Sequence, residues 1–330
     1  MRDRAEPSVS HQLLIEPSAP FRLDLTVWAL RRRSHNAIDR WDASGAYRRV
    51  VLVDGRPVSL LVAQDGGAMA PRLSVVLSGG PFDAREEELA RSALDRLLGL
   101  SVDLSAFSTM ALTDPQVGPL AERMRGLKPP RFPTAFEALV NGVACQQLSL
   151  TVGIHLLNRL AAAHGRAAAD GPANARAFPD PVALASLQPD ELKRHGFSTA
   201  KARTIIEVAR AIATGDLDLE ALHTLDDDAA VERLVELRGI GRWTAEYVLL
   251  RGLGRLHVFP GDDVGAQSKL KRLLGIDAPL RYDDVRALVA RWQPFAGVVY
   301  FHLLLDSLTR PADGRPLVGA GKSTAQADAV

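Results

Sequence analysis

The sequence predicts an α+β fold, in which a small antiparallel sheet domain is followed by an all-helical region. Short runs with strand periodicity and one Asp-Gly turn occupy the first ~110 residues. After Asp114 the strand patterns nearly vanish, and helical patterns separated by Pro, Gly and Asp continue to about residue 310. We therefore expect a flexible N-terminus at 1–18, an α+β domain at 19–112, a helical region at 113–310 and a disordered tail at 311–330.

The sheet domain begins with an alternating pattern. Apolar side chains alternate with polar ones at Phe21, Leu23, Leu25 and Val27, which is the period of a half-buried strand. Two further runs flank Asp54-Gly55, a dipeptide typical of a tight hairpin turn. The remaining elements are expected as strands at 47–53, 58–62 and 72–77, and as a helix that starts at Asp83.

The helical region is divided by turn-forming residues into short segments. Its helices are expected at 115–126, 133–149, 150–164, 180–186, 189–195, 199–214, 218–223, 227–237, 242–253, 263–274, 282–292 and 294–309.

Composition and charge exclude several classes of protein. The formal net charge is +1, so DNA binding would need a local patch or backbone N–H groups rather than a basic chain. The single cysteine, Cys145, excludes a disulfide, a Cys-ligated zinc site and a four-cysteine iron–sulfur cluster within one chain. No run approaches the ~20 apolar residues of a membrane span, and the N-terminus lacks a signal peptide core. We expect a soluble, cytoplasmic protein that does not bind membranes.

A helix–turn–helix pattern occupies residues 227–253. Asp residues at 226–228 can cap a helix that runs to Leu237, Gly239-Ile240-Gly241 reverses the chain, and a second helix begins near Arg242. The first N–H groups of that second helix lack partners and lie at the positive end of its dipole, so a phosphate fits there. On Gly-x-Gly alone, an ordinary αα-hairpin remains the better interpretation.

Two further features follow this turn. Trp243 and Tyr247 are four residues apart and share one helix face, which most often means core packing. Asp262 and Asp263 precede the helix at 263–274, and either could simply cap it.

The order of these motifs resembles the helix-hairpin-helix–Gly/Pro–Asp superfamily of DNA glycosylases, and within it the alkylation-repair branch, DNA-3-methyladenine glycosylase II. The resemblance extends over about residues 110–310, and the preceding sheet domain suits this branch. It rests on the pattern LxGIGxWTAxY followed by FPxxDxG, formed by Leu237, Gly239, Ile240, Gly241, Trp243, Thr244, Ala245, Tyr247, Phe259, Pro260, Asp263 and Gly265.

The resemblance implies a role for each part of the site. Asp263 would be the catalytic carboxylate, with Asp262 as its neighbour or the helix cap. A fixed carboxylate stabilises the positive charge that builds on a sugar when its bond to the base breaks, and it can activate the attacking water. An electron-rich ring attracts a base that carries positive charge. The base pocket would comprise Trp243, Tyr247 and Gln146.

The DNA contacts follow from the same resemblance. The segment at 136–149 would supply the side chain that fills the gap left by a flipped base, with Gln147 preferred and Leu148 second. The expected phosphate-binding residues are Gly239, Gly241, Arg242, Thr244 and Lys201. Arg123, Arg125, Lys128 and Arg131 form a basic run that we interpret as a weak electrostatic landing patch.

The resemblance also limits cofactors and chemistry. Carbonyls of Val235, Leu237 and Ile240 would hold a structural Na⁺ or K⁺ at the hairpin, and no other cofactor or iron–sulfur cluster is expected. Bifunctional members carry a lysine where this chain has Trp243, so no covalent amine chemistry is expected. The alkylation branch often has a late aromatic where this chain has Leu304, which leaves Tyr300 and Phe301 as candidates for that pocket wall.

The sequence therefore predicts a monomeric, monofunctional glycosylase that acts on alkylated bases in damaged double-stranded DNA. Two alternatives remain at this point. One is a related glycosylase for deaminated or mismatched bases. The other is a non-catalytic DNA-binding protein that kept the hairpin.

Overall fold

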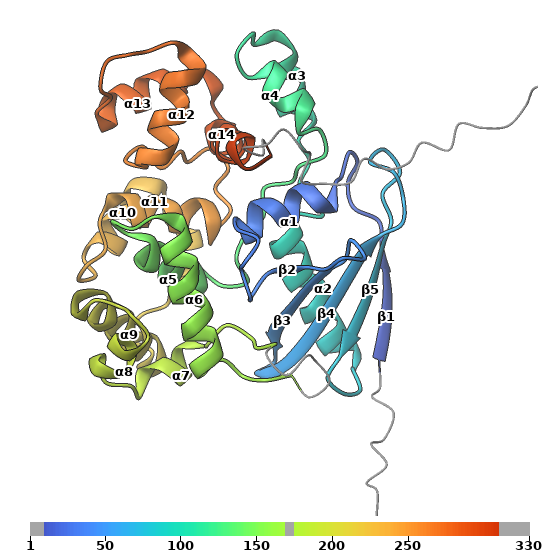
Figure 1. Ribbon diagram of the computed structural model, residues 1–330, viewed down its shortest axis with the longest axis vertical. Helices are drawn as coiled ribbons and strands as arrows, with labels where there is room; N and C mark the ends of the chain where they lie inside the picture. Colours follow the sequence, from blue (N-terminus) through green and yellow to red (C-terminus); the bar gives the residue numbers. More distant parts are fainter. Residues whose placement is uncertain (1–9, 169–174, 310–330) are drawn as a thin grey trace, which may run out of the picture.

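A computed structural model describes residues 10–168 and 175–309 and shows an antiparallel sheet beside a larger assembly of helices (Figure 1). The strand order is β1-β5-β4-β3-β2, so the α+β prediction is confirmed. The strands are β1 (Ser10–Ile15), β2 (Arg40–Trp41), β3 (Tyr47–Val53), β4 (Arg56–Gln64) and β5 (Leu73–Ser78).

The hairpin predicted at Asp54-Gly55 joins β3 to β4. Val53 pairs with Arg56, which leaves a two-residue loop, and Asp54 and Gly55 have φ of 49° and 76°. Positive φ at both central residues matches the right-handed twist of the flanking strands. The turn therefore fixes the register of the two central strands.

The flexible N-terminus predicted for 1–18 is wrong from Ser10 onward. Residues 10–15 form the edge strand β1, which pairs with β5 from Ser10 opposite Ser78 to Ile15 opposite Leu73. The strand is held by ladder hydrogen bonds to β5, a distant segment of the chain, so the local sequence does not reveal it. Residues 1–9 and the tail predicted at 311–330 lie outside the described residues.

The strand predicted at Phe21–Val27 is also wrong, because the chain there forms α1 (Leu23–Arg31). Two separate stripes of this helix are buried. Leu23 and Val27 pack in the core beneath the sheet, whereas Leu25 and Ala29 pack in a second core that includes the last helix. Burial on two sides makes alternate residues apolar, so a helix imitates the pattern of a strand.

The helix predicted from Asp83 is α2 (Ala84–Leu98), and it lies along the sheet (Figure 1). The Asp83 side chain accepts the N–H of Glu86, and the Glu86 side chain accepts the N–H of Asp83, which completes a capping box. Leu94 and Leu97 are fully buried, so the helix covers the inner face of the sheet.

The predicted boundary at 112/113 divides a helix pair that packs together. A helix not expected from the sequence, α3 (Ser105–Thr113), contacts α4 (Gly118–Arg123). Phe107 and Ala111 on α3 share a core with Trp292 near the C-terminus. This helix therefore packs with elements on the far side of the predicted boundary.

The remaining helices follow the predicted order, with most ends within a few residues. They are α5 (Ala135–Cys145), α6 (Leu150–His164), α7 (Pro181–Ala185), α8 (Pro189–Arg194), α9 (Thr199–Thr214), η1 (Glu220–Thr224), α10 (Asp227–Val235), α11 (Arg242–Arg251), α12 (Val264–Leu274), α13 (Tyr282–Val289), η2 (Ala290–Trp292) and α14 (Ala296–Thr309).

No single helix within 10–168 and 175–309 is long and apolar enough to cross a membrane. The segments Tyr282–Trp292 and Ala296–Asp306 pass a test of length and composition only when taken together, across a bend of 105°.

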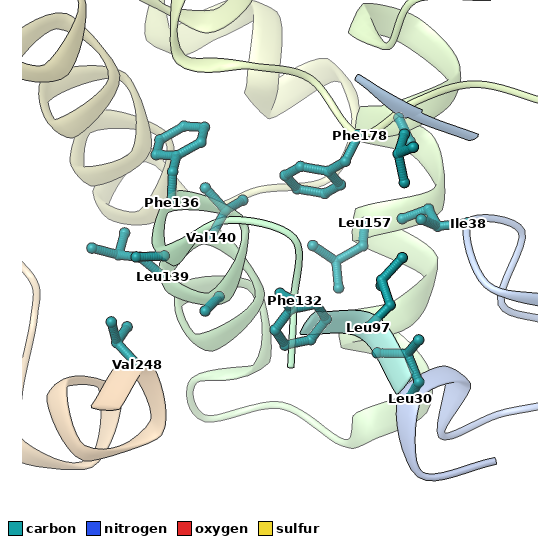
Figure 2. Close-up of a cluster of buried hydrophobic side chains, with 14 of the residues drawn as sticks. Leu30, Ile38, Leu97, Phe132, Phe136, Leu139, Val140, Leu157, Phe178 and Val248 are labelled. Atoms are coloured by element: carbon teal, nitrogen blue, oxygen red, sulfur yellow. The ribbon is translucent and has the colours of Figure 1, made fainter. Parts of the chain in front are cut away.

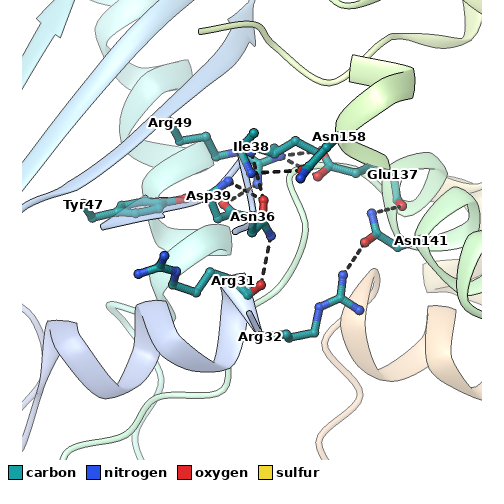
Figure 3. A network of polar contacts seen from close by, with 11 residues as sticks. Arg31, Arg32, Asn36, Ile38, Asp39, Tyr47, Arg49, Glu137, Asn141 and Asn158 are labelled. Carbon is teal, nitrogen blue, oxygen red and sulfur yellow. Dashed lines mark hydrogen bonds and ion pairs between the residues drawn. The ribbon is translucent and has the colours of Figure 1, made fainter. Parts of the chain in front are cut away.

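One hydrophobic core runs from the sheet domain into the helices. Leu30 and Leu97 from the sheet domain pack with Phe132 and with Leu139 and Val140 on α5 (Figure 2). A buried polar cluster crosses the same junction (Figure 3). Arg49 on β3 donates to Asp39 at 2.6 Å and to both carboxylate oxygens of Glu137 on α5, at 2.5 and 2.7 Å.

These contacts fix α5 relative to the sheet. Arg49 is 1% exposed, and both acids are also buried, so its charge is compensated by protein groups rather than by water. The C-terminal end of α5 carries Gln146 and Gln147. The sheet domain therefore acts as a rigid support for one side of the site.

Candidate active site

A cavity of about 980 Å³ opens where six parts of the fold converge. Its walls come from the end of α1, the turn after α5, the start of α9, the hairpin with α11, the start of α12, and α14. Most of the residues assigned to the site from the sequence line it: Gln146, Gln147, Leu148, Lys201, Gly239, Trp243, Tyr247 and Asp263.

The two hairpin glycines have different physical roles. Gly239 has φ of 81°, and a Cβ there would meet the Thr204 hydroxyl at 2.3 Å, so the turn and its packing alone require glycine. Gly241 has an ordinary φ of −100° and caps α11, and a Cβ there would meet nothing within 4 Å. The first turn of α11 is thus left open at Gly241, so a phosphate oxygen can approach its N–H groups.

Asp263 is held by three hydrogen bonds at the start of α12. Its Oδ1 accepts the backbone N–H of Ala266 at 2.8 Å, which makes Asp263 the N-cap. Its Oδ2 accepts the Trp243 Nε1–H at 3.1 Å and the Tyr300 hydroxyl at 2.8 Å. Capping and catalysis are therefore not alternatives for this residue, and the suggestion that Asp262 is the cap is wrong. Asp262 is exposed at the cavity edge.

The aromatic wall includes residues from two helices. Trp243 is half-buried and its ring lies 5.5 Å from that of Tyr247, with a tilt of 32°. Tyr300 and Phe301 on α14 line the cavity together with Leu304. Burial and the neighbouring Asp263 carboxylate raise the pKa of Tyr300 well above its ordinary value, so its hydroxyl stays a donor to that carboxylate.

Gln146, Thr244 and Lys201 hold the hairpin and α5 together. The Gln146 amide donates to the Gly239 carbonyl at 3.0 Å and to the Thr244 hydroxyl oxygen at 2.9 Å. Thr244 is 1% exposed, so the phosphate contact predicted at this residue would come from its backbone N–H in the first turn of α11. The Lys201 ammonium donates to the carbonyls of Ala144 at 3.0 Å and Gln146 at 2.7 Å.

Lys201 therefore caps the C-terminal end of α5 with two of its three N–H donors, and its contact with phosphate stays a prediction. Partial burial lowers the pKa of its amine. A cation at this end also interacts favourably with the helix dipole. The sequence gives no sign of this role, because the carbonyls are 55 and 57 residues away along the chain.

Gln147 and Leu148 follow this fixed point and extend outward. Gln147 is exposed and has φ of 54°, which is uncommon for a residue other than glycine. Leu148 is 43% exposed despite its apolar side chain. The helix predicted to continue to residue 149 ends at Cys145, and the left-handed turn places both side chains at the rim of the cavity.

The loop before Asp263 is anchored by Glu246 on α11. Its carboxylate accepts the Gly261 N–H at 3.0 Å and the Tyr282 hydroxyl at 2.6 Å. Burial raises the pKa of Glu246, and these two donors oppose that change. Arg242 is exposed, and its guanidinium lies 4.4 Å from the centre of the Tyr282 ring.

Sequence reasoning missed four cations in the cavity wall, which are Arg32, Arg33, Arg251 and Lys269. Arg32 and Arg251 are buried, at 8% and 3% exposure, and Lys269 is half-buried six residues after Asp263. Burial lowers the pKa of the Lys269 amine, and the Asp263 charge opposes that change.

The basic run predicted as a landing patch does not form one. Arg123 forms an ion pair with Asp306 at 2.9 Å. Lys128 is 1% exposed and donates to the Val102 carbonyl, and Arg131 is half-buried. These side chains stabilise the junction before α5, so their spacing along the sequence was misleading.

The candidate metal ligands at the hairpin are backbone carbonyls rather than side chains. No group of three or more His, Cys, Asp or Glu side chains that could hold a metal lies within the described ranges. The carbonyls of Val235, Leu237 and Ile240 lie at the end of α10 and in the turn, where backbone oxygens have few partners within the helix. The Leu237 carbonyl already accepts the Ile240 N–H at 3.0 Å, which leaves one lone pair for a cation.

A helix–Gly-x-Gly–helix turn next to an aromatic cavity with one anchored carboxylate is the arrangement that the resemblance to DNA glycosylases implies. The family model described as HhH-GPD superfamily base excision DNA repair protein matches residues 140–294. The DNA-3-methyladenine glycosylase of Bacillus subtilis is 32% identical over 204 residues, which are 62% of this chain and 67% of that protein.

A second relative and one solved structure extend the likeness into the sheet domain. A Mycobacterium tuberculosis protein, described as a probable bifunctional transcriptional activator and DNA repair enzyme, is 32% identical across 78% of this chain and 50% of its own length. The structure of a 3-methyladenine DNA glycosylase from Archaeoglobus fulgidus has a TM-score of 0.78 and 26% identity, and it covers 89% of this chain and 97% of its own. The chain belongs to the HhH-GPD superfamily, and its relatives place it among the DNA glycosylases.

Proposed function

We propose that this protein is a monofunctional DNA glycosylase that removes alkylated bases of the 3-methyladenine type from duplex DNA. The proposal rests on one observation above all. The Asp263 carboxylate lies at the wall of an aromatic cavity, fixed by Trp243, Tyr300 and its own helix. The relatives named for this activity support the same substrate class.

The residues perform separate steps in this mechanism. The N–H groups at the start of α11 bind a backbone phosphate beside the lesion. The carbonyls of Val235, Leu237 and Ile240 would hold a Na⁺ or K⁺, which would add positive charge near that phosphate. Gln147, with Leu148, fills the gap left in the base stack. The flipped base then enters the cavity and stacks on Trp243 and Tyr247.

Asp263 serves the sugar when the glycosidic bond breaks. The base leaves with the bonding electron pair, and positive charge builds at the sugar carbon and its ring oxygen. A carboxylate offers about four acceptor positions, and three at Asp263 are occupied by protein donors. The position left on Oδ1 can orient water, whose oxygen bonds to the sugar carbon while its proton passes to solvent or to the departing base.

The proposal also includes hydrolysis without strand cleavage. Trp243 stands where bifunctional members carry the attacking lysine, and its ring nitrogen donates to Asp263 instead. Two other amines line the cavity, Lys201 and Lys269. Lys201 is held by two carbonyls, whereas Lys269 has the lowered pKa expected of a nucleophilic amine, so the test must cover it.

The experiment is incubation of the full chain with duplexes that carry a single 7-methylguanine, 3-methyladenine, hypoxanthine or uracil. Abasic sites are scored after alkali, and a parallel sample contains borohydride. We expect release of the methylated purines and no trapped protein–DNA adduct. Release of none of the four bases would support the non-catalytic alternative. An adduct that forms with the wild type and is absent with Lys269→Gln would show that the Lys269 amine attacks the sugar, and it would contradict hydrolysis by water.

A further inference from the structure

Two buried arginines in the cavity wall have no acidic partner. Neither Arg32 nor Arg251 forms an ion pair with any described residue. Among residues 10–168 and 175–309, no hydrogen-bond partner is found for three of their nitrogens, which are Arg32 Nε, Arg251 Nε and Arg251 Nη2. Neutral acceptors hold both guanidinium groups, and both lie near the Phe132 ring, at 5.7 and 5.0 Å from its centre, so their charges are offset without a contacting carboxylate. Burying two cations at one cavity wall is still costly, which indicates a role outside stability. The cavity has five basic and two acidic lining side chains, so its wall is positive overall.

Arg32 is held in one position by both ends of its guanidinium. It caps the C-terminus of α1 with φ of 60°, and the left-handed turn directs it away from the sheet domain. One terminal nitrogen donates to the Asn141 side-chain oxygen at 2.6 Å, and Asn141 donates in turn to the Glu137 carbonyl at 3.0 Å (Figure 3). The other donates to the Tyr247 hydroxyl oxygen at 3.0 Å.

This contact determines what Tyr247 offers to a base. A guanidinium can only donate, so the tyrosine oxygen accepts from Arg32 and its own hydrogen must point elsewhere. The hydroxyl hydrogen has no acceptor among the described residues, and Tyr247 lines the cavity. A hydroxyl that accepts from a cation is a stronger donor, because the two hydrogen bonds polarise one another.

We propose that Arg32 is a specificity-determining residue that raises the excision rate of neutral purines with an acceptor edge relative to that of cationic N-alkylated purines. This proposal rests on the proposed glycosylase function and names the substrate class that this wall selects. A neutral base leaves with an extra negative charge, which the Tyr247 hydroxyl and the Arg32 charge stabilise in the transition state. A cationic base leaves as a neutral molecule and gains nothing from a second cation nearby.

The Trp243 ring and the two arginines, Arg32 and Arg251, therefore have opposite effects on the binding of a cationic base. Trp243 attracts a cationic base through its ring, as the sequence predicted. Arg32 and Arg251 repel the same charge at short range. The balance extends the range of bases toward neutral lesions without removing activity on alkylated ones.

The test compares one neutral and one cationic base in the same duplex, namely hypoxanthine and 7-methylguanine. Single-turnover excision is measured for the wild type, Arg32→Met and Tyr247→Phe. A hydrogen bond to a charged group is worth roughly 10- to 100-fold in rate. We expect both variants to lower the ratio of the hypoxanthine excision rate to the 7-methylguanine excision rate by about 10- to 100-fold.

Arg31→Met is the matched control, since Arg31 is the adjacent buried arginine and does not line the cavity. It should leave the ratio of the two rates unchanged, and thermal unfolding of all variants reports any loss of folding. If Arg32→Met does not fold, Tyr247→Phe alone carries the test, because it removes one oxygen. Equal loss on both bases would overturn the specificity role and leave the proposed function intact. Release of neither base by the wild type would overturn both proposals.

Discussion

Replacing Asp263 by asparagine should separate excision from DNA binding. Asparagine keeps an oxygen for the Ala266 N–H, and Asn and Asp are equivalent as N-caps, so α12 should still start at the same residue. The amide group then faces two donors, Trp243 and Tyr300. Tyr300 can turn its hydroxyl to accept, but the indole N–H can only donate and is left unpaired.

The magnitudes follow from these contacts. One unpaired, partly buried N–H destabilises the fold by about 1–3 kcal/mol, which most domains of this size tolerate. Loss of the charge removes electrostatic stabilisation of the transition state, and removal of one such preorganised group slows catalysis by about 10²–10³-fold. The variant should therefore fold and bind DNA, and its excision should fall by at least that factor.

Three measurements test this prediction on the same preparation: single-turnover base release, fluorescence anisotropy with a lesion duplex, and thermal unfolding. Asp262→Asn provides the matched control, because Asp262 is an exposed acid adjacent in the chain, and its excision should stay within about twofold. Excision by Asp263→Asn within tenfold of the wild type, with unfolding unchanged, would refute the role of this carboxylate.

Three further predictions concern the support of the site. Arg49→Met should lower the free energy of unfolding by about 3–5 kcal/mol, because it leaves the Glu137 charge buried and unpaired; urea denaturation measures this, and a loss below 1 kcal/mol would contradict it. Lys201→Met should slow excision and speed amide hydrogen exchange at Gln147, because the C-terminal end of α5 loses its cap. The slope of log Kd for DNA against log salt concentration should stay unchanged. Loss of a phosphate contact would instead reduce that slope by about one. Burial lowers the pKa of His302 to about 4, so the unfolded chain binds more protons than the native one between about pH 6.5 and 4, and stability falls as the pH drops through that window. Between about pH 6.5 and 4, the free energy of unfolding of His302→Gln should fall by about 3 kcal/mol less than that of the wild type. Denaturation at the two pH values measures both changes, and equal changes would contradict a lowered pKa at His302.

Local patterns predicted those parts of the site that lie close together in the chain. The hairpin, its capping aspartates and Asp263 fall within about forty consecutive residues, where turn and capping chemistry act over three or four positions. The hairpin turn at Asp54-Gly55 was predictable for the same reason. In each case the sequence contains both partners of the interaction within one turn.

Features that depend on distant partners were missed or misread. Arg32 meets Tyr247 across 215 positions, and Lys201 meets α5 across more than fifty, so neither contact has a local signature. The Asp263 side chain was treated as either a cap or a catalytic group, because a sequence does not show that its two oxygens face different donors. The helix at Leu23–Arg31 was mistaken for a strand because two cores cover it.

The position of α1 between those two cores limits how the protein can be truncated or combined with parts of other proteins. A fragment that begins after the sheet would keep the hairpin and Asp263, but it would lose Arg32 and the apolar stripe that Leu25 and Ala29 contribute beside α14. Its reaction chamber would then lack one wall and open to bulk water. The helical region is therefore not expected to be functional without α1, and a chimera that lacks α1 requires a redesigned surface at that position.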